Sequence, residues 1–213
     1  MNLNRFLALF FVLCFSSSVA PLLAENSAKK ESPPVSPVES RLIVKQAKYV
    51  LPKSRYGKAF RKRIEAETDD DKLPAAPKVD LVLELKNISK EDVMIFPRGA
   101  LIYPDLTVKG QGVVQPENLR TASGESSSSS IQPTIQPGKT YRLSINSLNP
   151  NGGTPWFFWC EPGEYTITAT YTVYTGLPPF PLPDNTKPKG KPKKFNVTTP
   201  PVKVKVVLED NAE

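Results

Sequence analysis

The amino-acid sequence predicts an all-β fold, a single antiparallel β-sandwich with long loop insertions. Three segments carry this prediction, because apolar and polar residues alternate along them with the two-residue period of a half-buried strand. In the first, one face carries Val79, Leu81, Leu83 and Leu85, and the other carries Asp80, Glu84 and Lys86. Tyr165–Val173 alternates with threonine, and Val202–Leu208 alternates with lysine in its first half.

The first predicted strand is Leu42–Leu51, which is rich in β-branched and aromatic residues and ends at Pro52. The segment 52–78 is predicted to be a long loop, basic in its first half and acidic in its second. A short helix without a clear cap is expected within it, around Gly57–Glu67. Pairing between the two halves would reduce the electrostatic field that an outside partner meets.

Further short strands are predicted downstream, separated by turn-forming residues and by two more long loops. The strands are placed at Val93–Phe96, in two apolar segments within Ala100–Val114, and at Lys139–Leu148, and the loops at 115–136 and 175–195.

The N-terminal residues 1–24 are predicted to be a cleaved secretion signal. Arg5 precedes an apolar run of roughly ten residues and a small-residue stretch, and the run is about half as long as a bilayer span requires. Residues 25–40 are polar and proline-rich and are predicted to be a flexible leader, with the sandwich domain at 41–209 and a tail at 210–213. We expect a secreted, periplasmic or cell-surface protein with no transmembrane helix after signal cleavage.

The chain is basic, with a formal net charge of +7. A basic exported protein favours anionic partners, so we expect acidic polysaccharide or cell-wall material as the ligand, with an exported protein as the other partner class. Nucleic acid is not expected outside the cell.

The sequence shows no catalytic constellation, so we expect a protein without enzymatic activity, cofactor or metal. The chain contains no histidine, and Cys160, the only cysteine beyond the signal, therefore lacks the usual base. Cys160 is either buried as a small hydrophobic residue or links two chains, since oxidising compartments tend to pair or exclude thiols. The acidic cluster Asp69–Asp71 lacks the alternating ligands and the glycine of a calcium loop, which favours a solvated acidic run.

The segment Glu161–Ile167 (EPGEYTI) resembles the start of the penultimate strand of an immunoglobulin-like sandwich. There a glycine turn precedes a corner tyrosine whose hydroxyl bonds back to the chain. Ile167 stands where antibody-type domains carry a cysteine, so the pattern is similar to the disulfide-free bacterial exported immunoglobulin-like modules. It also resembles the bacterial sandwich-type proteinase inhibitor family. The resemblance implies an immunoglobulin-like sandwich over roughly Val79–Leu208 and implies no site residues.

Two features are candidate contacts for a ligand or partner. Along a strand, the aromatic run Trp156–Cys160 turns Phe157 and Trp159 to one side, where they either form an exposed platform or are covered by the proline-rich segment Leu177–Pro183. The second feature is a lysine cluster consisting of Lys187, Lys189, Lys191, Lys193 and Lys194. Together with the basic residues of 53–63, it either forms one polyanion-binding surface or serves only solubility.

The sequence therefore predicts a non-enzymatic exported β-sandwich protein with a binding or structural role. The alternative is an inhibitor or accessory subunit that docks on an exported enzyme through loops at one end of the sandwich. A histidine-free hydrolase that uses two carboxylates is a third hypothesis, for which the sequence places no converging pair.

Overall fold

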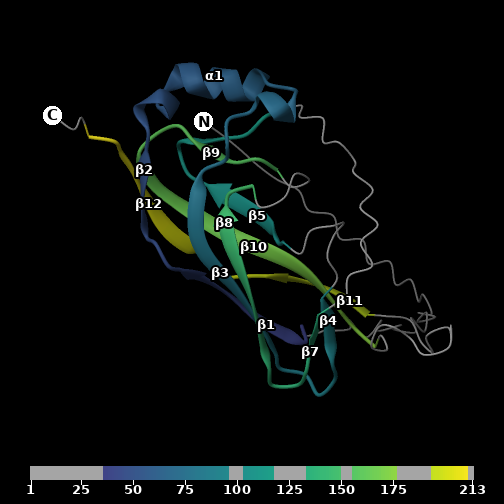
Figure 1. Cartoon of the computed structure of the whole chain (residues 1–213). Coiled ribbons are helices and arrows are strands. Elements are labelled where there is room, and N and C mark those ends of the chain that lie inside the picture. The colour runs from purple at the N-terminus through teal and green to yellow at the C-terminus, as the bar shows by residue number, and fades with distance from the viewer. Residues whose placement is uncertain (1–35, 96–102, 118–132, 150–154, 177–192, 211–213) are drawn as a thin grey trace, which may run out of the picture. The chain divides into compact units, whose positions relative to one another are not determined.

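The computed structural model describes residues 36–95, 103–117, 133–149, 155–176 and 193–210, and it shows an all-β fold with one α-helix in these residues (Figure 1). The all-β prediction is confirmed, while the immunoglobulin-like arrangement within that class stays a prediction. The predicted signal, residues 1–24, and most of the predicted leader lie outside the described residues. No helix among the described residues is long and apolar enough to cross a membrane.

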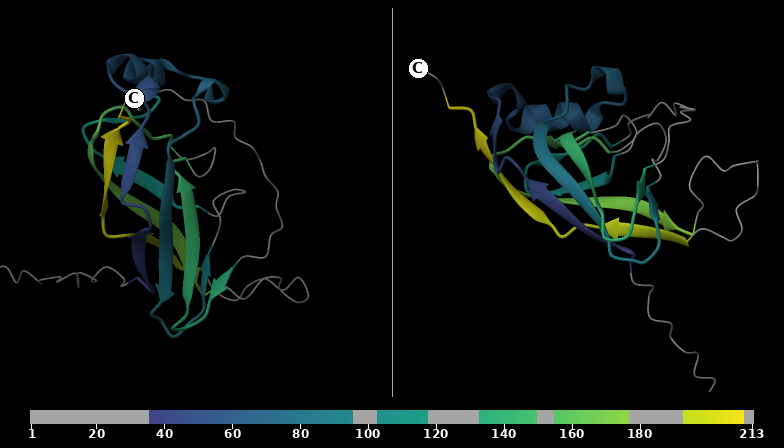
Figure 2. Two further views of the ribbon diagram at one scale, coloured as in Figure 1. Left: turned by 60° about the vertical axis from the view of Figure 1, so that its left-hand side comes forward. Right: turned by 60° about the horizontal axis from the view of Figure 1, so that its bottom comes forward.

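The strands form two main sheets (Figure 2). The first contains β1 (Val38–Val44), β3 (Lys78–Asn87) and β8 (Thr140–Ser147), in that order. The second runs β2 (Lys48–Leu51), β12 (Val202–Leu208), β10 (Gly163–Thr175), β4 (Val93–Ile95) and β7 (Thr134–Ile135), and β5 (Asp105–Lys109) and β11 (Lys193–Thr198) also pair with β10. A small third sheet pairs β6 (Val113–Val114) with β9 (Phe158–Trp159). All pairings are antiparallel except that of β2 with β12.

The two main sheets enclose one hydrophobic core. The apolar faces predicted from the sequence point into it: Leu81, Leu83 and Leu85 of β3 meet Val204 and Val206 of β12 in the same cluster of buried residues. Burial of apolar surface is the main favourable term in folding, so these alternating faces account for the sheet positions of β3 and β12.

The prediction of one strand at Leu42–Leu51 is wrong, because this segment contributes to two strands in different sheets. Strand β1 begins at Val38, inside the predicted leader, and the chain crosses to the second sheet before β2 starts. The crossing allows Leu42 of β1 and Leu51 of β2 to be buried in the same core from opposite sheets. The predicted loops at 115–136 and 175–195 are also shorter than expected, because they overlap β7, the end of β10 and the start of β11.

Segment 52–78 contains three short helices rather than an irregular loop. They are η1 (Lys53–Arg55), α1 (Lys58–Ala66) and η2 (Asp70–Lys72). The short helix expected around Gly57–Glu67 is confirmed: those two residues are the caps of α1, and no side chain caps its N-terminus.

Tyr165, at the start of β10, forms the corner contact predicted from its resemblance to immunoglobulin-like sandwiches. Its hydroxyl donates a hydrogen bond to the carbonyl oxygen of Glu161 at 2.5 Å. Burial raises the pKa of this hydroxyl to about 12, so it stays protonated as a donor. Gly110 and Gly112 make room for the ring, since a Cβ on Gly112 would lie 2.2 Å from the Tyr165 oxygen.

We expect Gly112→Ala to lower the free energy of unfolding by about 2 kcal/mol, because the added methyl group overpacks the corner. Tyr165→Phe should cost about 1 kcal/mol through loss of the hydrogen bond. The double variant should lose less than the sum, since removing the hydroxyl relieves part of the clash. Urea denaturation of the four proteins measures this coupling, and strict additivity would show that the hydroxyl and Gly112 do not share this space.

Candidate functional site

The aromatic run Trp156–Cys160 is buried on both of its faces. Phe157 is 7% exposed and Trp159 is 3% exposed, and both belong to the main core. The indole ring of Trp159 lies between Tyr49 and Tyr165, with ring centroids 5.2 Å and 5.7 Å away. This burial excludes Phe157 and Trp159 as an open aromatic platform. The segment Leu177–Pro183, expected to cover them, lies outside the described residues.

The other face of the run carries helix α1. Phe158 and Cys160 form a second buried cluster with Phe60 and Ile64 of the helix. The backbone N–H of Gly57 also donates to the carbonyl oxygen of Cys160 at 2.8 Å, which fixes the start of the helix to the run. The expectation that Cys160 is buried is confirmed, and burial raises the pKa of its thiol.

Docking on the aromatic run, rather than local helix stability, holds α1 in place. The first turn has no acidic residue, and Lys58 lies there against the positive end of the helix dipole. Lys58 and Lys62 are spaced i,i+4, and like charges at this spacing destabilise a helix. The nine-residue helix is also too short to be stable alone.

The docked helix presents positive charge to solvent. We define the α1 basic surface as the exposed residues Lys53, Lys58, Lys62 and Arg63. None of them makes an ion pair with another described residue. Arg63 instead lies over the ring of Phe60, with its guanidinium carbon 5.3 Å from the ring centroid.

The acidic half of segment 52–78 pairs with other cations. Arg61 contacts Glu65 at 3.6 Å and Glu161 at 3.8 Å, and Lys72 contacts Asp69 at 3.0 Å. The carboxylates of Asp69–Asp71 lie within 4.8 Å of one another, and Lys72 already offsets part of their charge. The expected pairing between the two halves therefore involves Arg61 and leaves the α1 basic surface unneutralised by described residues.

The lysine cluster is only partly described. Lys193 and Lys194 are exposed in β11, whereas Lys187, Lys189 and Lys191 lie outside the described residues. Strand β11 pairs with the last residues of β10, and α1 packs on the run just before β10 begins. A thirteen-residue strand is about 40 Å long, so α1 and β11 lie at opposite ends of it (Figure 1). Lys193 and Lys194 therefore do not join residues 53–63 in one compact surface.

The structure also shows a charged row that the sequence did not reveal. Arg41 of β1, Glu84 of β3 and Arg142 of β8 lie side by side on the outer face of the first sheet. The Nε of Arg142 donates to Glu84 Oε1 at 2.5 Å, and the Nε of Arg41 donates to Glu84 Oε2. These hydrogen bonds hold the pKa of Glu84 below its ordinary value, with the Arg41 bond the largest cause.

Comparison with protein-family models, with curated proteins and with solved structures finds no match to this chain. The argument for function therefore rests on the chain's own residues.

Glu84 should make stability depend on pH in the acid range. A carboxyl whose pKa is lower in the folded state contributes stability above its unfolded pKa, and this contribution is lost as pH falls through the folded value. We expect wild type to be more stable than Glu84→Gln at pH 7, and the difference to shrink as pH falls below 4.5, the ordinary value. Denaturant midpoints from pH 7 to pH 2 measure it. A constant difference across that range would contradict the role assigned to the Glu84 charge.

Proposed function

We propose that this chain is an exported, non-enzymatic β-sandwich protein that binds acidic polysaccharide or cell-wall material through the α1 basic surface. The observation that carries the proposal is the arrangement of α1: a helix held by Phe60 and Ile64 against the aromatic run, with exposed cations that form no ion pair with described residues.

The positions of these cations favour a binding role over a role in folding. Lys58 lies at the unfavourable end of the helix dipole, and its spacing from Lys62 is repulsive, so both positions reduce helix stability. These cations destabilise their own helix, yet the helix is held firmly against the aromatic run. This combination fits a surface that recognises an anionic polymer, because the bound polymer would neutralise several of the charges at once.

The chemistry of the described residues supports a non-enzymatic role. The chain has no histidine, and the thiol of Cys160 is buried with a raised pKa, which keeps it from acting as a nucleophile. Glu84 uses both carboxylate oxygens to bind arginines, so its side chain does not serve as a free acid or base.

The test is binding to polygalacturonate, a carboxylated polysaccharide. We expect wild type to bind with an affinity that falls as salt rises, because the contacts are between exposed charges. Lys58→Gln and Lys62→Gln should each weaken binding about fivefold at low salt, the equivalent of one contact between unit charges in water.

The matched control is the double variant Lys203→Gln, Lys205→Gln, which removes two exposed lysines from β12. It should leave the affinity within about twofold of wild type, because it does not touch α1, although it removes as much charge as the double variant Lys58→Gln, Lys62→Gln. Equal losses in these two double variants would mean that net charge alone drives binding. Absence of binding by wild type would end the proposal.

A further inference from the structure

The row Arg41, Glu84 and Arg142 leaves most of the hydrogen-bonding capacity of its two arginines unused. The Glu84 side chain is 5% exposed, whereas the side chains of Arg41 and Arg142 are 68% and 70% exposed. Each arginine donates to Glu84 through Nε. A guanidinium has five N–H donors, and the remaining ones on each arginine have no partner among the described residues.

Sharing one carboxylate also leaves this row with an excess of positive charge. Two guanidiniums meet one carboxylate, which neutralises only one of them. Lys86 is aligned with Glu39 and Thr140 in the next row of the same three strands, so the two rows together hold three cations and two carboxylates. An ion-pair network whose only role was to hold the strands together would need one carboxylate for each arginine.

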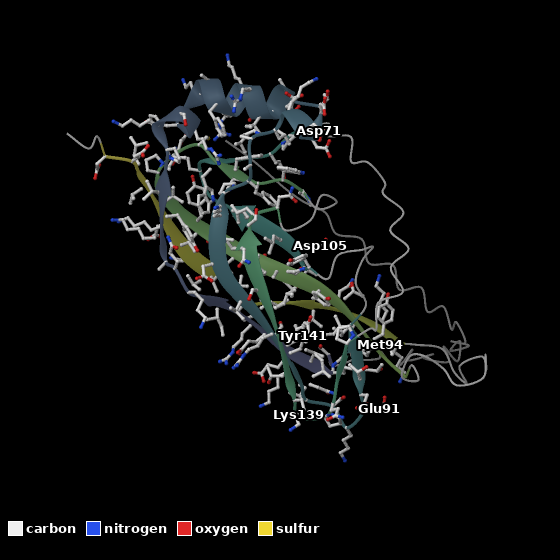
Figure 3. All side chains as sticks on the ribbon, in the orientation of Figure 1. Asp71, Glu91, Met94, Asp105, Lys139 and Tyr141 are labelled. Carbon is white, nitrogen blue, oxygen red and sulfur yellow. The ribbon has the colours of Figure 1, made fainter. Side chains whose placement is uncertain are left out.

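A groove lies over this part of the sheet. It has a volume of about 200 Å³ and is lined by Glu39, Ser40, Arg41, Glu84, Lys86 and Thr140. Lys139, the neighbour of Thr140, is labelled at one end of the described domain and Asp71, which follows α1, at the other (Figure 3). The groove is therefore separate from the α1 basic surface.

We infer that Arg41, which lines the groove, and Arg142, which lies on the other side of Glu84 in the same row, bind the carboxylate of an acidic sugar through their free N–H groups. Guanidinium groups match the planar geometry of a carboxylate with paired, charge-assisted hydrogen bonds. Glu84 is a positioning residue, because its two oxygens hold both Nε atoms and so fix the direction in which the remaining donors point. Thr140 and Lys86 supply polar groups beside the arginines, as the hydroxyl-rich ring of a sugar requires.

The inference does not need the α1 basic surface to bind anything. We name trigalacturonate, which carries three carboxylates, as the probe and its fully methyl-esterified form as the uncharged control. We expect calorimetry on the whole protein to detect trigalacturonate and not the ester.

Arg41→Gln and Arg142→Gln should each weaken trigalacturonate binding about tenfold, as expected from the loss of charge-assisted hydrogen bonds. Lys205→Gln is the matched control, because it removes one exposed lysine from β12, outside both this row and the α1 basic surface, and should leave this affinity unchanged. Circular dichroism and thermal melting establish that the arginine variants remain folded. Arg142→Lys keeps the positive charge but lacks the paired N–H donors of a guanidinium, so it should still bind several-fold more weakly than wild type.

Three results would overturn the inference: no binding of trigalacturonate by wild type, equal binding of the ester, or equal losses in the arginine variants and in Lys205→Gln. These outcomes are distinct from failure of the proposed function, which is measured with the polymer and with the α1 variants.

Discussion

The structure depends on the burial of one short aromatic segment on both of its faces. Phe157 and Trp159 enter the core between the two sheets, while Phe158 and Cys160 hold helix α1. Because consecutive side chains of an extended segment point in opposite directions, five residues serve two packing layers. The run also pairs with β6 and leads into β10, the strand with the most neighbours in the second sheet. The position of α1 is thus tied directly to the centre of the fold.

This arrangement has a functional consequence. A helix with poor intrinsic stability is held at one end of the sandwich by its apolar side, and its basic side is left to solvent. On the outer face of the first sheet, Glu84 holds two arginines. In both places, buried or nearly buried groups restrict the conformations of exposed cationic side chains. These side chains therefore lose less conformational entropy when a ligand binds. The polymer binding that we propose would use these two separated cationic regions at different points along one extended anionic chain.

The sequence predicted the strands in which apolar and polar residues alternate regularly. It did not predict the features that depend on which strands pair with each other. The inward faces of β3, β10 and β12 follow from the two-residue period, and the Tyr165 corner follows from its glycine turn. The division of Leu42–Leu51 between two sheets could not be predicted, because both halves are equally β-forming and only long-range pairing separates them. The row Arg41, Glu84 and Arg142 depends on the register of three strands distant in sequence, so outward-pointing charges alone did not reveal it.

The most direct test of this account is amide hydrogen exchange across the described domain in wild type and in Phe158→Ala. The account predicts that the amides of α1 lose most of their protection while those of β3 and β10 keep theirs, because the variant removes the ring on which Phe60 packs. Unchanged protection of α1 would contradict the claim that the aromatic run holds the helix, and with it the physical basis of the α1 basic surface.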